Sequence, residues 1–113
     1  MRWLITGGCG FIGRNLIHSL LLQNDNRAIR VVDNLTTGTT KGIDGVEVVR
    51  ADVEDVDIAM EATRGVDFVV HLAGNTGVAP SVDFPRADCK ANVLGTLNYL
   101  EAARKNNVKR FIF

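Results

Sequence analysis

Glycines near the start of the chain have the spacing that brings a backbone close to phosphate groups. The sequence reads Gly7-x-x-Gly10-x-x-Gly13 and, taken from Gly8, also Gly-x-Gly-x-x-Gly. A turn that leaves a strand and holds a pyrophosphate needs residues without a Cβ, and the helix that follows presents free amides and a positive dipole end. Because the motif follows a strand-like run and opens a helix-like one, it predicts a dinucleotide site.

An acidic residue follows at the distance where such sites recognise the sugar. Asp33 ends the second apolar run, twenty residues after Gly13, and a carboxylate there accepts hydrogen bonds from both hydroxyls of an adenosine ribose. It would repel the additional phosphate of NADP, and residues 34–37 contain no arginine to offset that repulsion. We therefore expect NAD rather than NADP. The alternative is that Asp33 only caps the turn that continues through Asn34.

The elements that must position these residues are strands and helices in alternation, since short apolar runs alternate with apolar stripes at helical spacing. Short apolar runs predict strands at 3–5, 29–32, 46–49, 68–70 and 111–113. Apolar stripes at helical spacing predict helices over 11–22 and 88–106, the second carrying Val93, Leu97, Leu100 and Ala103. Several strand runs are apolar almost throughout, as in a parallel sheet that is covered on both faces. This order predicts an α/β fold, a Rossmann-type doubly wound parallel sheet of about five strands.

The composition is that of an ordinary globular domain. The chain has 113 residues, of which 46% are hydrophobic and 23% charged, so one core is expected and disorder is not. Thirteen basic and thirteen acidic side chains cancel, which argues against a nucleic-acid partner. No apolar run approaches the roughly 18 residues of a membrane span. With only Cys9 and Cys89, we expect no disulfide framework, no metal site and a cytoplasmic setting.

Further segments arrive in the order of a known family. They are Val32 to Gly38, Ala51 to Val53, His71 to Gly74, Asn92 to Thr96 and Val108 to Phe113. With the glycine turn, they resemble the NAD-dependent epimerase/dehydratase family of extended short-chain dehydrogenase/reductases, and most of all its UDP-glucose 4-epimerases. The resemblance covers the whole chain.

The resemblance implies a site for NAD. The Asp52 carboxylate and the Val53 amide would contact the adenine, and the stretch that follows the fourth strand would lie along the ribose and diphosphate. The predicted cofactor-binding residues are Gly7, Gly10, Phe11, Ile12, Gly13, Asp33, Asn34, Asp52, Val53, Leu72, Ala73 and Gly74. Residues 76–82 resemble the sugar-facing loop. Asn92 either binds near the cofactor or braces its own helix, and His71 is expected to be structural.

The family's catalytic residues, a Ser or Thr and a Tyr-x-x-x-Lys pair, lie beyond the fifth strand. Here the only tyrosine is Tyr99, and Ala103 stands four residues after it, so the motif does not occur and we expect Tyr99 to pack. Residues 1–113 are thus expected to be the NAD-binding Rossmann domain of a longer enzyme, truncated before the catalytic residues and inactive alone.

The function implied for the full-length protein is nucleotide-sugar epimerisation, with transient hydride transfer at the sugar C4. We expect a UDP-sugar substrate and a homodimer. Two alternatives stay open: a nucleotide-sugar 4,6-dehydratase or decarboxylase of the same family, and a noncatalytic NAD-binding sensor or scaffold. The forty residues after Phe113 would separate them, since only an enzyme needs the Ser or Thr and the Tyr-x-x-x-Lys pair.

Overall fold

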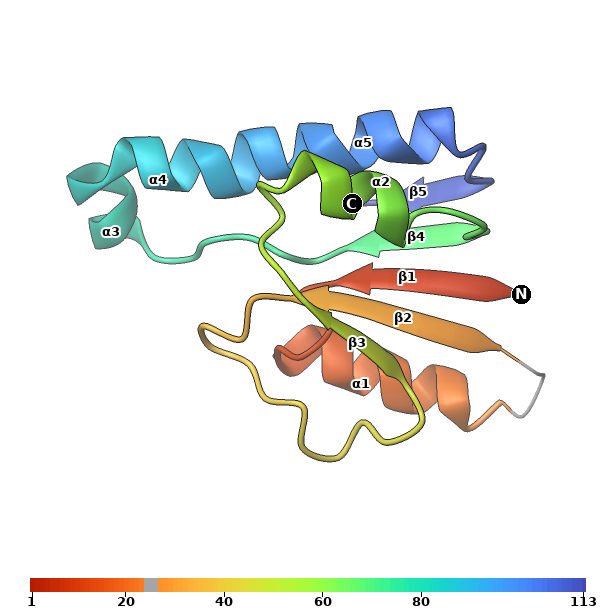
Figure 1. The fold of residues 1–113 in the computed structure, drawn as a ribbon. Coiled ribbons are helices and arrows are strands. Elements are labelled where there is room, and N and C mark those ends of the chain that lie inside the picture. Colours follow the sequence, from red (N-terminus) through yellow and green to blue (C-terminus); the bar gives the residue numbers. More distant parts are fainter. Residues whose placement is uncertain (24–26) are drawn as a thin grey trace.

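One parallel sheet organises the molecule, for which a computed structural model describes residues 1–23 and 27–113. Its strands are β1 (Arg2–Thr6), β2 (Ala28–Asp33), β3 (Glu47–Arg50), β4 (Phe68–His71) and β5 (Arg110–Ile112). They lie in the order β3-β2-β1-β4-β5, and every neighbouring pair is parallel (Figure 1). The predicted α/β fold with a Rossmann-type sheet is therefore confirmed.

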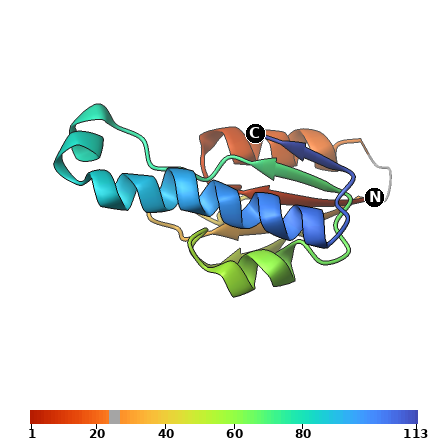
Figure 2. The same cartoon turned by 90° about the horizontal axis from the view of Figure 1, so that it is seen from above.

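Helices cover both faces of this sheet. Helix α1 (Phe11–Leu21) lies on one face, and α2 (Val56–Ala62) and α5 (Gly95–Lys105) lie on the other (Figures 1 and 2). Among the described residues, no helix is long and apolar enough to cross a membrane.

The helix predicted over 88–106 begins earlier and is interrupted. Helix α4 (Pro85–Cys89), a π-turn η1 (Lys90–Leu94) and α5 follow one another as a continuous rod (Figure 2). A short helix α3 (Val78–Asp83) precedes them, so most of the segment predicted as a loop at 76–82 is helical. Neither α2 nor α3 was expected, because each is too short for a helical apolar period to stand out.

Strands β1, β2 and β4 each contribute to two cores, because adjacent strand residues point to opposite faces. On the side of α2 and α5, buried residues include Leu4, Val32, Val69 and Tyr99. On the side of α1 they include Ile5, Val31, Val70, Ile17 and Leu20. The alternation along β1, β2 and β4 thus fixes which helix packs on which face.

The packing face of α5 is made of Tyr99 and small residues, namely Gly95, Ala102 and Ala103. Small side chains there let the helix approach the sheet and α2 closely. The apolar stripe Val93, Leu97 and Leu100 is between 45% and 59% exposed. Of the predicted stripe only Ala103 is buried, so the large apolar side chains of this stripe face outward.

Candidate functional site

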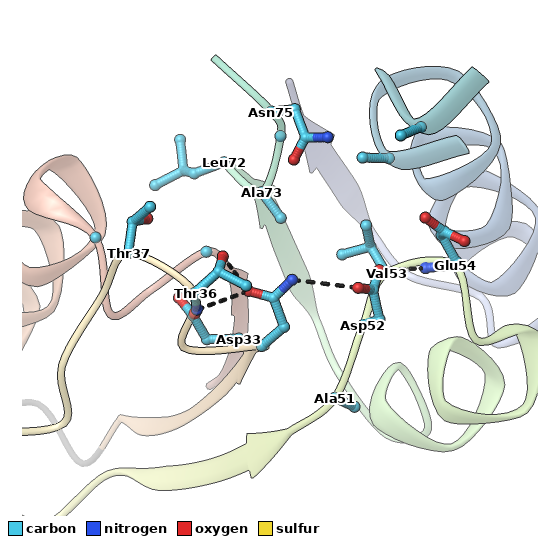
Figure 3. A pocket seen from close by; sticks show the side chains of 16 residues that line it. Asp33, Thr36, Thr37, Ala51, Asp52, Val53, Glu54, Leu72, Ala73 and Asn75 are labelled. Atoms are coloured by element: carbon cyan, nitrogen blue, oxygen red, sulfur yellow. Dashed lines mark hydrogen bonds between the residues drawn. The ribbon is translucent and has the colours of Figure 1, made fainter. Parts of the chain in front are cut away.

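A pocket lies at the carboxyl ends of the strands, where the strand order reverses beside β1. Open α/β sheets bind ligands at this place, since the connections on either side leave toward opposite faces and open a crevice. Loops after β1, β2, β3 and β4 line the pocket, with two residues from the rod of α4 and η1 (Figure 3). Its lining residues are Gly7, Gly10, Asp33, Asn34, Thr36, Thr37, Ala51, Asp52, Val53, Glu54, Leu72, Ala73, Gly74, Asn75, Ala87 and Ala91.

Most of the residues predicted from the sequence meet at this pocket. The exceptions are Phe11, Ile12 and Gly13, which form the first turn of α1 beside it; Phe11 and Ile12 are exposed and Gly13 is buried.

Several lining residues are not among the predicted cofactor-binding residues: Thr36, Thr37, Ala51, Glu54, Asn75, Ala87 and Ala91. Most of them directly follow or flank strand ends, and this position in the sequence is the signal that could have identified them as pocket residues. Ala87 and Ala91 reach the pocket from the rod, which no local pattern indicates.

The glycine turn packs against its neighbours too tightly for side chains. Gly7 has a φ of +67°, and a Cβ on it would stand 2.7 Å from the amide nitrogen of Ala73. A Cβ on Gly13 would stand 2.5 Å from the Cα of Gly8. Helix α1 therefore begins directly on the turn. The first bond within the helix runs from the Arg14 amide to the Gly10 carbonyl, 3.0 Å, which leaves the amides of residues 11–13 without an acceptor inside α1.

The carboxylate of Asp33 is almost buried, 9% exposed, and holds two backbone amides. Its Oδ1 accepts the Leu35 amide at 2.8 Å, as the turn-capping interpretation expected, and its Oδ2 accepts the Cys9 amide at 2.9 Å. Each oxygen keeps a further lone pair for a ligand, so the capping role and a ribose contact are compatible. Burial, and then the charge of Asp33, raise the pKa of the Cys9 thiol, which keeps it protonated and unreactive.

Asn34 connects the two walls that follow β2 and β3. Its Nδ2 donates to Oδ2 of Asp52 at 3.2 Å, and its Oδ1 accepts the amide and hydroxyl of Thr36 (Figure 3). The other oxygen of Asp52 accepts the amide of Glu54 at 3.1 Å. These bonds fix the orientation of Asp52 before any ligand arrives.

His71 is the centre of a buried chain of hydrogen bonds. The hydroxyl of Thr96 donates to the Asn92 carbonyl at 2.7 Å, so it accepts from Nε2 of His71 at 3.1 Å. Nδ1 then accepts from the hydroxyl of Thr6 at 2.7 Å, and that oxygen accepts the amide of Ala73. Burial lowers the pKa of His71 to about 4. The ring is therefore neutral and structural, as expected.

Asn92 braces the wall that follows β4. Its Oδ1 accepts the amide of Asn75 at 2.7 Å, and its Nδ2 donates to the carbonyl of Asn75 at 3.1 Å and to Asp88 at 3.1 Å. Of the two interpretations left open by the sequence, the structure thus supports a bracing role, toward the pocket loop as well as its own helix. The residue sits in the π-turn, an irregularity that is frequent at functional sites.

Tyr99 is fully buried in the core beneath α5. Burial, and then the charges of Asp55 and Asp52, raise the pKa of its hydroxyl, so it cannot exchange protons with a substrate near neutral pH. The expectation that Tyr99 packs is confirmed. Within residues 1–23 and 27–113, no group of three His, Cys, Asp or Glu side chains could hold a metal ion.

Charge is unevenly distributed around the pocket. Asp33, Asp52 and Glu54 lie on the side of β2 and β3, whereas the N-terminus of α1 lies behind Gly10 on the side of β1. The first side suits hydroxyls and N–H donors. The second suits an anion, because the helix dipole and free amides attract negative charge.

Comparison with known proteins agrees with this geometry. Residues 3–113 match the family model described as the NAD dependent epimerase/dehydratase family. The chain is 35% identical over 114 residues to the dTDP-glucose 4,6-dehydratase of Mycobacterium tuberculosis, covering 96% of this chain and 34% of that protein. It is 35% identical over 119 residues to the UDP-glucose 4-epimerase of Mycolicibacterium smegmatis, covering 99% and 37%.

A solved structure also aligns along the whole chain. The UDP-glucose 4-epimerase of Thermus thermophilus in complex with NAD matches with a TM-score of 0.91 at 38% identity. The match covers 100% of this chain and 37% of that one. The chain thus spans about a third of the length of the relatives it matches.

Proposed function

Because the chain belongs to the NAD-dependent epimerase/dehydratase family, we propose that the pocket at the carboxyl ends of its strands binds NAD. The observation that carries the proposal is the convergence of four strand-end loops and the N-terminus of α1 on one pocket. Gly10 leaves room where a dinucleotide has to approach the backbone, since the closest atom to a Cβ built there is the Gly7 carbonyl oxygen, 3.4 Å away.

The charge distribution orients the dinucleotide. Its adenosine lies on the acidic side, with the ribose hydroxyls donating to Asp33 and the adenine against Asp52 and the Val53 amide. Its diphosphate lies against the first turn of α1, where the amides of Phe11 and Ile12 have no acceptor inside the helix. Leu72 to Gly74 form the wall beside the remaining ribose. NAD is preferred to NADP because a 2′-phosphate would meet the Asp33 carboxylate.

For the full-length protein we propose nucleotide-sugar epimerisation, with UDP-glucose or a related UDP-sugar as substrate. NAD held in this pocket would supply reversible hydride transfer at the sugar C4. The part of the site described in this chain holds and orients the cofactor. We propose that a Ser or Thr and a Tyr-x-x-x-Lys pair outside residues 1–113 handle the hydroxyl proton, since Tyr99 is buried and inert.

The second candidate is a 4,6-dehydratase, because relatives of both names match this chain at the same 35% identity. A cofactor pocket alone does not distinguish the two, since both reactions begin with hydride removal. A noncatalytic NAD sensor is the third. The proposed setting, a cytoplasmic homodimer, is supported by the free cysteines and by the outward apolar stripe Val93, Leu97 and Leu100.

The test uses the full-length protein. Calorimetry with NAD and NADP measures the cofactor preference, and a protein that binds neither contradicts the proposal. Incubation with UDP-glucose and with dTDP-glucose then separates the activities, because an epimerase yields the galactose epimer and a dehydratase yields a 4-keto-6-deoxy sugar. Binding of NAD without either product leaves the sensor as the function. Sedimentation of the same sample measures the oligomeric state.

A further inference from the structure

We propose that Asn98 is a positioning residue for the adenosine end of the pocket, a role that rests on the proposed NAD site. Asn98 is half-buried on α5 and does not line the pocket. Its amide nitrogen donates to the carbonyls of Val53 and Glu54, at 3.0 and 3.1 Å. These two carbonyls belong to the loop that carries the adenine-facing groups.

The geometry makes this contact the attachment of the loop to the rod of α4, η1 and α5. Val53 is buried against α5 at Gly95, where a Cβ would stand 2.6 Å from the valine Cγ2. Helix and loop therefore touch at two places: the Gly95 backbone packs against the Val53 side chain, and the Asn98 amide binds the carbonyls of Val53 and Glu54. Since the carbonyls of Val53 and Glu54 are held from the rod, the Asp52 carboxylate and the Val53 amide are left to face the pocket.

The same rod holds the opposite wall. Asn92 in η1 binds both the amide and the carbonyl of Asn75, while Asn98 binds the loop after β3. Two asparagine side chains of one continuous element thus attach to two loops that line the pocket, one after β3 and one after β4. Figure 3 shows Val53, Glu54 and Asn75 of these loops at the pocket. The spacing of those walls is set by the rod, and Asn98 sets the adenine side of it.

A matched control lies at the C-terminal cap of the same rod. Asn106, also half-buried, donates its amide to the Met60 carbonyl at 2.9 Å and to the Thr63 hydroxyl at 2.8 Å. Like Asn98, it makes two hydrogen bonds through its side-chain amide. Its partners belong to the α2 region, away from the pocket. Loss of either side chain removes two bonds, and only one of the two losses touches the loop at 52–54.

The experiment compares Asn98→Ala with Asn106→Ala in the full-length protein. We expect both to lower the melting temperature by similar amounts. Asn98→Ala alone should weaken the affinity for both NAD and AMP, each by about three- to tenfold, the range of about one net hydrogen bond. AMP is the probe for the adenosine end because it lacks the nicotinamide half. Without ligand, amide exchange at Val53 and Glu54 should accelerate in Asn98→Ala and not in Asn106→Ala.

Three results would overturn the inference: unchanged affinities in Asn98→Ala, equal losses in both variants, or a loss for NAD without one for AMP. A wild-type protein that binds no NAD overturns the proposed function itself, which keeps the two failures distinct. If Asn98→Ala does not fold, Gly95→Ala displaces Val53 at the second contact between α5 and this loop. It should weaken NAD and AMP together, and unchanged affinities in that variant also overturn the inference.

Discussion

The carboxylate of Asp33 accepts the amide of Cys9 at 2.9 Å, so the end of β2 holds the glycine turn that follows β1. The residue proposed to recognise the ribose is therefore also a tie between two loops of the site. Its replacement should act on binding and on folding at once.

Replacement of Asp33 by Asn keeps one acceptor oxygen and removes the charge. We expect NAD affinity to fall by about ten- to a hundredfold, on the order of 1–3 kcal/mol, and the preference over NADP to narrow, because the 2′-phosphate no longer meets a carboxylate. Calorimetry with both cofactors measures this in the full-length protein. The exposed Asp44→Asn is the charge-matched control. An unchanged NAD/NADP ratio in Asp33→Asn would mean that another group recognises the ribose.

Two alanine substitutions in the glycine turn should separate binding from stability. In Gly10→Ala the new Cβ has 3.4 Å to its nearest neighbour, so the fold is kept while NAD affinity falls at least tenfold. In Gly13→Ala the Cβ would stand 2.5 Å from the Cα of Gly8, and we expect a loss of roughly 1–3 kcal/mol in the free energy of unfolding. Thermal melts and NAD titration distinguish the two. A Gly10→Ala variant with wild-type affinity would contradict the proposed place of the diphosphate.

Protonation of His71 should destabilise the fold. Its pKa is lowered to about 4 in the folded state, from an ordinary 6.5, so the unfolded chain binds the proton first as the pH falls. Stability is complete above about pH 6.5 and is lost toward pH 4, with a limiting slope of about 1.4 kcal/mol per pH unit from this group. Urea unfolding between pH 6.5 and 5 measures the slope. A ring that titrates by NMR near its ordinary value would contradict the prediction.

The end of α5 carries a small strain that can be relieved. Asn107 has a φ of +56°, and the bonds Asn107 to Arg104 and Val108 to Ala103 form the closing pair of a Schellman motif. Asn107→Gly should raise the free energy of unfolding slightly, whereas Asn107→Val should lower it by about 1 kcal/mol. Melting temperatures of the two variants and of the wild type give the order of their stabilities. A valine variant as stable as the wild type would contradict this prediction.

Residues 1–113 alone should be inactive and prone to associate. The outer edge of β5 has no strand beside it among the residues that the structure describes, and Phe113 is 86% exposed next to it. Such an edge pairs with other chains. Light scattering over a dilution series and an epimerase assay on the same sample test the two expectations. A monodisperse monomer at high concentration contradicts the first, and measurable turnover contradicts the second.

The sequence predicted the elements whose signal is local. The sheet followed from apolar runs, and the place of the pocket followed from the glycine turn and from Asp33 at the end of its strand. The hydrogen bond from the Cys9 amide to Asp33 could not be foreseen, because the two residues come together only after β1 and β2 pair.

The packing and the contacts of the rod of α4, η1 and α5 could not be predicted from the sequence. Its apolar stripe suggested one packing face, yet the buried face is Tyr99 with small residues, since helix approach to the sheet depends on side-chain size. The contacts of Asn92 and Asn98 join residues far apart in the chain, and a π-turn has no local pattern that predicts it. Asparagine at those positions is equally typical of an ordinary helix surface.

The central place of β1 also sets the order of events when the chain is made. Its first partner begins at Ala28, and its second pairs only when Phe68 comes opposite Trp3, 65 residues later. At about 5–20 residues per second, synthesis leaves this apolar strand half-paired for several seconds. Parallel pairing over such separations is slow. The segment that ends in the glycine turn is therefore made well before its second partner strand and is completed late, which leaves an apolar strand edge exposed in the interval.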